Sequence, residues 1–174
     1  MNKLFSDNRI NESAIVDVSS IVFNEKFREY CRADVCGRFG KTWNCPPAVG
    51  EFEKCRNHAL SFDKAFVFTH TGEISDFSDM TAMNRLRDET MEILSDISAK
   101  LREKEIRFQP LGCGSCNECE KCTYPDAPCR YPEKAVPPVE SYGIDVKTLA
   151  DANGMTYYAD SGIVTFFCII LYDL

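Results

Sequence analysis

The residues best suited to chemistry are five cysteines in the second half of the chain. Two residues separate each of the first four and six separate the last two, in the series Cys113, Cys116, Cys119, Cys122 and Cys129. A tetrahedral zinc site generally takes one Cys-x2-Cys pair from each of two separated segments, whereas a close series of cysteines with a more remote ligand suits an iron-sulfur cubane. The spacing therefore favours a 4Fe-4S cluster, with zinc as the alternative.

One such cluster needs four protein ligands, so this series contains one cysteine too many. We expect the four ligands to be Cys116, Cys119, Cys122 and Cys129. Cys113 ends the preceding apolar stretch, and two roles stay open for it. It either serves the other cysteine-rich segment as a ligand or lies in the core as a small buried hydrophobe.

A second cysteine-rich segment lies nearer the start of the chain. It contains Cys31, Cys36 and Cys45, and two prolines follow the last of them. Cysteine followed by proline recurs at cluster sites, because proline lacks an N–H and its fixed φ turns the loop away from the sulfurs. The fourth position then falls to Cys113, Cys55, a non-protein ligand or a substrate. Alternatively, these three cysteines complete a site shared with the other segment, or simply pack.

Three polar or aromatic residues within the two cysteine-rich segments are further candidates. Lys41, Trp43 and Arg130 have side chains that donate hydrogen bonds, and two of them carry positive charge. Such groups stabilise an electron-rich cluster and raise its reduction potential. They are equally compatible with ordinary loop positions.

The other potential ligands fit structural roles better. His58 and His70 are the only histidines, and neither has a partner at metal-ligand spacing. Cys168 lies within an apolar run and is expected in the core, as is Cys55 on a predicted helix. Glu140 and Asp145 flank a glycine and are expected to cap the short helix that follows.

Composition restricts the partners and the compartment. The chain has ten cysteines and a formal net charge of -7, and this acidity argues against a role that grips nucleic acid or an anionic membrane. We expect no leader segment, and the longest apolar run, residues 162–171, is too short to span a bilayer. We expect a cytoplasmic protein with reduced thiols instead of disulfides. Its partner is then a redox protein or a small-molecule substrate.

Hydrophobic periodicity indicates the elements that must position the cysteines. The pattern predicts helices over residues 24–32, 51–60, 80–101 and 146–152, and strands over residues 14–23, 64–71, 106–111, 155–159 and 163–172. Ser78 is the expected N-cap of the long helix, whose methionines are expected in the core. The last two strands are expected to form a hairpin that places the final strand centrally in the sheet.

These elements predict the α/β class, as an α+β sandwich with a mixed sheet of about five strands and flanking helices. Residues 1–174 are expected to form a single domain. Glycines and prolines are dense in both cysteine-rich segments and predict irregular structure there. We therefore expect cysteine-rich metal-binding loops at 31–50 and 112–138.

Two sets of motifs extend over most of the chain. The first is a cysteine pair, a Gly-Lys stretch and Cys-Pro-Pro, at Cys31, Cys36, Gly40, Lys41, Cys45, Pro46 and Pro47. The second is Cys-x2-Cys-x2-Cys, Cys-Arg-x-Pro and Gly-Ile-Asp-Val, at Cys116, Cys119, Cys122, Cys129, Arg130, Pro132, Gly143, Ile144, Asp145 and Val146. Together they resemble a prokaryotic family of predicted metal-binding proteins, domain of unknown function 2284. The resemblance implies metal binding and supplies no reaction.

The chain departs from that family at two places. Phe39 stands where tyrosine is usual in the family. Residues 135–140 read Ala-Val-Pro-Pro-Val-Glu, where the family tends to read Ala-Arg-Pro-Ser-Met-Glu. Any role of that arginine and serine in the family therefore has no counterpart in this chain.

Three functions are compatible with these features. The leading hypothesis is a cytoplasmic metal-binding protein that carries one or two 4Fe-4S clusters for electron transfer or redox support. The second is a redox enzyme that binds its substrate at an open iron of a cluster held by Cys31, Cys36 and Cys45. The third is a structural or interaction protein whose loops are stapled together by zinc.

Overall fold

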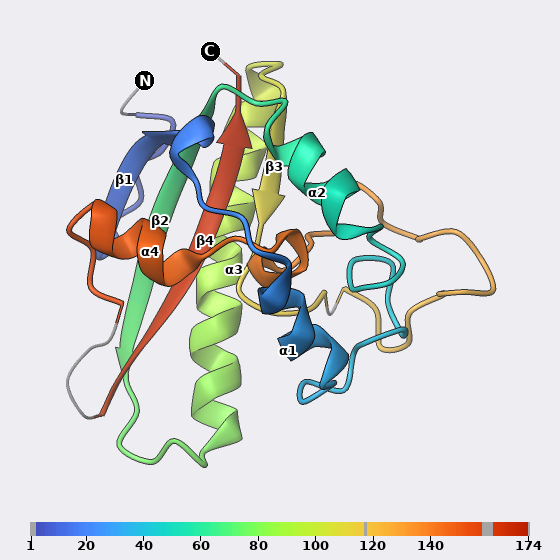
Figure 1. Cartoon of the computed structure of the whole chain (residues 1–174). Coiled ribbons are helices and arrows are strands. Elements are labelled where there is room, and N and C mark those ends of the chain that lie inside the picture. Colours follow the sequence, from blue (N-terminus) through green and yellow to red (C-terminus); the bar gives the residue numbers. More distant parts are fainter. Residues whose placement is uncertain (1–2, 117, 158–161, 174) are drawn as a thin grey trace.

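The structure is built around a four-stranded antiparallel sheet (Figure 1). It is a computed structural model that describes residues 3–116, 118–157 and 162–173. The strands are β1 (Glu12–Asp17), β2 (Lys64–Glu73), β3 (Phe108–Leu111) and β4 (Ile163–Tyr172). Their spatial order is β1-β2-β4-β3, and helical elements lie between β1 and β2, between β2 and β3, and between β3 and β4 in the chain.

Each face of the sheet has its own hydrophobic core. Side chains alternate along β2, so that Val67 belongs to one core and Phe68 to the other. The long helix α3 (Met80–Glu103) covers the face of Phe68 (Figure 1). The opposite core receives residues from α2 (Phe52–Ala59) and α4 (Val146–Ala152). The sheet thus lies between two layers, as predicted for an α+β sandwich.

The last strand, β4, lies between β2 and β3, which is the central position predicted for it. Its residues from Cys168 to Leu171 are all 0% exposed. A central strand with both faces covered needs a nearly continuous apolar sequence, because neither set of its alternating side chains meets water. The apolar run at the end of the chain meets this need.

Two features of the predicted sheet are wrong. The sheet is antiparallel throughout instead of mixed. The α3 crossover makes β2 and β3 run in the same direction, but β4 lies between them and pairs antiparallel with both. The described residues also form four strands, not about five. Residues 155–157 of the predicted hairpin have no strand structure, and Met155 packs into the core instead. Residues 158–161, which hold the rest of that strand and most of its turn, lie outside the described residues.

The helices lie close to their predicted positions, with local differences near the start of the chain. The predicted strand over residues 14–23 ends early and passes into a 3-10 turn, η1 (Val18–Ser20). The predicted helix over residues 24–32 is divided into a second 3-10 turn, η2 (Glu25–Phe27), and a short helix, α1 (Arg28–Arg32). Cys31 therefore stands on a helix and not in a loop.

The start of α3 differs from the prediction in its cap and its first methionine. Asp79, not Ser78, is the N-cap, because its carboxylate accepts the backbone N–H groups of Thr81 and Ala82 at 3.0 Å each. Met80 is 62% exposed rather than buried, since the first turn of the helix faces solvent. Among the helices of the described ranges, none has the length and apolar character needed to cross a membrane.

Both cysteine-rich segments lie on one side of the sheet, beside α1 (Figure 1). Residues 33–51 connect α1 to α2, and residues 112–138 connect β3 to a 3-10 turn, η3 (Val139–Tyr142). The turn η3 packs against both α1 and α2. The elements at the ends of the two segments therefore fix where the cysteines stand.

Candidate metal centre

The two cysteine-rich segments, here named the first loop (residues 31–50) and the second loop (residues 112–138), are in direct contact. The indole Nε1 of Trp43 in the first loop donates a hydrogen bond to the carbonyl of Ala127 in the second, at 3.1 Å. The Trp43 ring also meets Tyr124 edge to face, with ring centroids 5.0 Å apart. Trp43 therefore joins the two loops.

The first loop is braced by its own polar groups. The carboxylate of Asp34 accepts the backbone N–H of Phe39 at 2.8 Å and pairs with Lys41 Nζ at 3.3 Å. The Phe39 bond is the main reason why the pKa of Asp34 lies below its usual value. The backbone N–H of Gly40 donates to the carbonyl of Pro46 at 2.9 Å, which joins the middle of the loop to the first of its two prolines. Lys41 thus contributes to loop structure.

The second loop is tied at its base and within its tip. At the base, the N–H of Gly112 donates to Pro137 O at 2.9 Å, and the N–H of Val139 donates to Gly112 O at 3.0 Å. Within the tip, Arg130 Nη1 donates to the carbonyl of Lys121 at 2.9 Å. Although the loop lacks regular secondary structure, these bonds bring its distant parts together.

The four cysteines predicted as ligands in the second loop line one pocket between the two loops. The pocket measures about 20 Å³ and is lined on this side by Cys116, Cys119, Cys122 and Cys129. Thr42, Trp43 and Asn44 line it from the first loop. All ten cysteines of the chain are free thiols. Within the described parts of the chain, no three His, Cys, Asp or Glu side chains are arranged to hold a metal ion.

The thiols of this pocket influence one another electrostatically. Burial raises the pKa of Cys116, and the neighbouring Glu118, Cys129 and Cys119 raise it further. The backbone N–H of Glu118 opposes this by donating to the sulfur. Thiolates placed this close repel one another, and a bound cation removes that repulsion. The donor set is therefore suited to a thiophilic metal.

Two buried donors from the first loop face the same pocket. Asn44 is 7% exposed, and its Nδ2 has no hydrogen-bond partner among the described residues. Thr42 is 2% exposed, and its hydroxyl has no hydrogen-bond partner within the described ranges, although it favours the thiolate form of the neighbouring Cys45. Buried polar groups in native proteins nearly always have partners, so these donors indicate an acceptor that the protein alone does not supply.

The cysteines of the first loop lie near one another and near the second loop. Burial raises the pKa of Cys31 to about 11, and the charges of Glu140, Cys45 and Cys36 add to this effect. Cys45 is 4% exposed and is influenced in turn by Cys36 and by Cys116 of the second loop. The structure therefore brings all three first-loop cysteines into one neighbourhood.

The remaining three cysteines lie in the hydrophobic cores. Cys55 is 3% exposed in one core, and Cys168 is 0% exposed in the other, as expected for both. Cys113 is 9% exposed and belongs to the same core as Cys168, and its proximity, together with burial, raises the pKa of Cys168. Cys113 is therefore absent from the wall of the pocket. Its assignment as a ligand stays a prediction.

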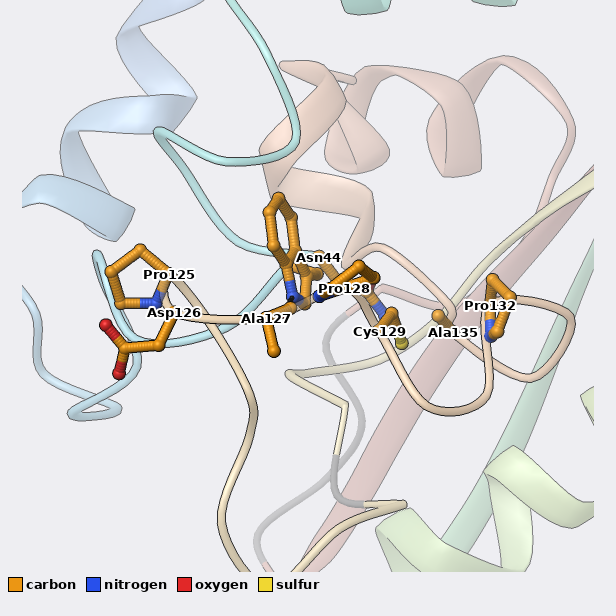
Figure 2. Close-up of a pocket in the computed structure, with 9 residues that line it drawn as sticks. Asn44, Pro125, Asp126, Ala127, Pro128, Cys129, Pro132 and Ala135 are labelled. Carbon is orange, nitrogen blue, oxygen red and sulfur yellow. Dashed lines mark hydrogen bonds between the residues drawn. The ribbon is translucent and has the colours of Figure 1, made fainter.

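A larger pocket opens on the surface beside the four-cysteine pocket (Figure 2). It measures about 530 Å³, and its walls are mainly proline and alanine side chains of residues 125–135. Trp43, Asn44 and Cys129 line both this pocket and the smaller one. One predicted ligand, Cys129, therefore connects the buried site with an accessible, mostly apolar surface.

The other candidates from the sequence have structural partners. His58 Nδ1 lies 3.0 Å from the hydroxyl of Tyr142, and His70 Nδ1 lies 2.8 Å from the carbonyl of Arg9. Asp145 caps α4 as predicted, because its carboxylate accepts the N–H of Thr148 at 3.0 Å. Glu140 belongs to η3 and does not cap that helix.

Several residues of the site were not predicted from the sequence. They are Arg28, Thr42, Asn44 and, as a group near cysteine thiols, Glu140. Arg28 stands three residues before Cys31, and Asn44 directly precedes Cys45, so proximity to a predicted ligand was the available signal. An unpaired donor indicates a missing ligand only when it is buried, and closeness to a cysteine in the sequence does not reveal burial.

Comparison with known proteins gives a family and nothing more specific. No curated protein and no solved structure matches the chain. The model of one family, described as "Predicted metal-binding protein (DUF2284)", matches residues 14–172. That range includes both loops, the sheet from within β1 to the end of β4, and every residue of the site described above. The chain therefore belongs to the DUF2284 family of predicted metal-binding proteins.

Proposed function

We propose that the protein transfers electrons through a 4Fe-4S cluster held by the second loop. The ligands are Cys116, Cys119, Cys122 and Cys129. The observation that carries this proposal is that all four line a single pocket although the last is separated from the others in the sequence. The protein would act in the cytoplasm, where thiols stay reduced.

The surroundings of the four cysteines favour a cluster over a single zinc ion. The close Cys-x2-Cys-x2-Cys series with a later cysteine is the arrangement typical of cubanes. The same pocket is lined by Asn44, whose Nδ2 has no partner among the described residues, and by the positively charged Arg38 and Arg130. Inorganic sulfides supply additional acceptors for such donors, and hydrogen bonds to sulfur are one of the main controls of cluster potential.

Cluster binding requires a change in the second loop. A cubane with its sulfides is larger than a pocket of about 20 Å³. The second loop lacks regular secondary structure, so its tip can rearrange while its base stays tied to the sheet through Gly112 and Val139. We infer that the loop closes over the cluster as the four thiolates bind it, which couples folding of the loop to metal binding.

The surface pocket supports electron transfer as the role of the cluster. Cys129 lines both pockets, so a molecule in the surface pocket would lie against a cluster ligand (Figure 2). A volume of about 530 Å³ with mostly apolar walls suits a small organic electron carrier or a protruding side chain of a redox protein. Electrons would then have a short route from the proposed cluster to such a partner.

The test is the metal and sulfide content of protein purified without oxygen. We expect at least about four irons and four acid-labile sulfides per chain for one cubane. The triple variant Cys116→Ser, Cys119→Ser, Cys122→Ser should lose about four of each. Cys55→Ala is the matched control, because Cys55 is buried in the core and lines neither pocket. Zinc without sulfide in the wild-type protein would overturn the proposal in favour of a zinc-stapled protein.

A further inference from the structure

The surface pocket of about 530 Å³ is lined by two turns of the second loop. In the first turn, the N–H of Ala127 donates to Thr123 O at 3.0 Å, and the hydroxyl of Thr123 donates to Pro128 O at 2.8 Å. In the second turn, the N–H of Lys134 donates to Tyr131 O at 3.0 Å. Each turn is closed by bonds of its own, so the pocket is formed before any ligand enters it.

Trp43 adds a fixed aromatic side chain to this pocket. Its Nε1 donates to Ala127 O at 3.1 Å, and its ring meets Tyr124 edge to face with centroids 5.0 Å apart. Both partners belong to the first turn, so the indole and that turn hold each other in place. An aromatic side chain that is already held loses little conformational entropy when a ligand packs against it.

The rest of the wall is mainly apolar. Three prolines and two alanines contribute to it, namely Pro125, Pro128, Pro132, Ala127 and Ala135. Figure 2 shows Pro125 at one end of the pocket, Pro132 and Ala135 at the other, and Pro128 between them. These short or ring-closed side chains have few rotamers, and they offer carbon surface with no hydrogen-bonding group. A ligand of this wall is therefore apolar over most of its own surface.

The charge of the pocket disfavours anionic ligands. Asp126 is the only charged residue among the described residues that line the pocket, and the chain has a formal net charge of -7. Figure 2 shows the Asp126 carboxylate at the outer end, directed away from the other labelled side chains. A phosphate or carboxylate group would meet repulsion there and no counter-charge. Flavin and nicotinamide nucleotides, which carry phosphates, do not match this lining.

The pocket also includes one of the proposed cluster ligands. Cys129 is half-buried and lines both the surface pocket and the four-cysteine pocket. Arg38 and Arg130 line the four-cysteine pocket alone. A molecule in the surface pocket would thus lie beside Cys129 without meeting either guanidinium. An uncharged electron carrier is the ligand class that this position favours, and this step rests on the proposed function.

We propose that the surface pocket binds an uncharged quinone. A quinone is a planar carbon ring that accepts electrons, and its carbonyl oxygens require no cation for binding. Its ring would pack against Trp43 and the prolines, beside Cys129. Binding itself needs no metal, because Cys129 is the only proposed ligand in the lining. The quinone site and the cluster can therefore fail separately.

The first experiment measures binding of 2,3-dimethyl-1,4-naphthoquinone by equilibrium dialysis without oxygen. The two methyl groups block the ring carbons to which free thiols would otherwise add. We expect saturable binding of one quinone per chain, both to the wild type and to the variant Cys116→Ser, Cys119→Ser, Cys122→Ser. Iron and sulfide analysis of the same samples tests the cluster independently.

Two results of the dialysis would overturn the inference. If the wild type shows no saturable binding, the pocket does not hold a quinone, and the side chain of a redox protein becomes its better occupant. If binding is lost in the triple-serine variant while circular dichroism shows a folded protein, the quinone lies at the cysteines and not in the surface pocket.

The second experiment tests the wall of the pocket. Trp43→Ala should weaken quinone binding about tenfold, whereas Trp43→Phe keeps an aromatic ring and should weaken it less. Ala135→Trp leaves Trp43 in place and fills the pocket, so it should abolish binding. Ala33→Trp is the matched control, because Ala33 is exposed and lines neither pocket. Wild-type affinity in Ala135→Trp would overturn the location of the site.

The third experiment tests the charge of the pocket with an anionic quinone, anthraquinone-2-sulfonate. Asp126→Lys replaces the carboxylate by a cation and should raise the affinity for this sulfonate several-fold. Glu120→Lys makes the same change of charge at an exposed position of the second loop outside both pockets, and should change the affinity little. An equal rise in the two variants, or none in Asp126→Lys, would contradict selection by the pocket against anions.

Discussion

At the scale of single residues, Asn44 connects the two pockets of the site. Asn44 is 7% exposed and lines both the four-cysteine pocket and the surface pocket, and its Nδ2 has no hydrogen-bond partner in the described part of the chain. A donor aimed at cluster sulfur stabilises the reduced, more negative state. If the second loop holds the proposed cluster, Asn44 is therefore placed to set its potential.

Replacing that donor should lower the reduction potential. Asn44→Asp exchanges the amide for a group that is negatively charged when ionised, which disfavours the reduced cluster. We expect a decrease on the order of tens of millivolts, measured by potentiometric titration followed by paramagnetic resonance. Asn57→Asp adds the same charge on the exposed side of α2, outside both pockets, and should leave the potential nearly unchanged. Equal shifts in the two variants would contradict the role of Asn44.

At the scale of elements, η3 is the connection on which the site geometry depends. It carries Glu140, packs against α1 and α2, and is fixed to α2 by the contact between Tyr142 and His58. Burial raises the pKa of Tyr142, so its hydroxyl stays protonated, and it lies 3.0 Å from Nδ1 of His58, within hydrogen-bond distance. This contact makes the position of η3 sensitive to acid.

Acidification should weaken the contact between α2 and η3. Burial, helped by Arg107 and Lys54, lowers the pKa of His58 below the usual 6.5. His58 therefore binds a proton more readily in the unfolded chain than in the folded protein. The stability that the neutral His58 gives above about pH 6.5 is lost as the pH falls through the lower pKa that His58 has in the folded protein. We expect the difference in Tm between about pH 7.5 and pH 5.5 to shrink in His58→Gln. The same change at His70 controls for the other histidine, and an unaltered difference in His58→Gln would contradict the prediction.

Gly143 sets the angle at which η3 leaves toward α4. Its φ is +69°, and an added Cβ would lie 2.6 Å from Phe52 Cε2 and 3.0 Å from the backbone O of Asn24. Gly154 has a similar φ of +65° but open space around it. Replacement by alanine should therefore cost about 1 kcal/mol at Gly154, from the left-handed backbone alone, and about 2 kcal/mol or more at Gly143.

Urea denaturation of the metal-free protein measures both free energies of unfolding. If the two alanine variants were equally stable, the close packing around Gly143 would not be important for the fold.

At the scale of the whole molecule, the sequence allowed more of the fold to be predicted than of the site. The periodicity of residues 146–152 reproduces the bounds of α4, and the apolar run ending at Tyr172 predicts a central strand, because both signals are local. The antiparallel order of the sheet depends on where β4 inserts, which no local pattern encodes.

The same distinction separates the two parts of the site. The spacing from Cys116 to Cys129 predicts four ligands, and the structure lines one pocket with them. Arg28 and Glu140 belong to α1 and η3, which are far apart in the sequence and meet only through the fold. A buried donor without a partner among the described residues, such as Arg28 Nη1, is visible only when burial is known, so the sequence could not predict it.

Removal of metal should separate the behaviour of the loops from that of the sheet. Trp43 is the only tryptophan, and it stands between the two loops and lines both pockets. Bound clusters would quench its emission, and the loops would lose the ligand that holds them closed. We expect oxidation and chelation to raise Trp43 fluorescence several-fold and to make both loops accessible to protease. The far-ultraviolet circular dichroism should change little, because the strands and α3 pack without any cysteine of the second loop except Cys113. Loss of sheet and loops in one step would instead show that the metal supports the whole fold.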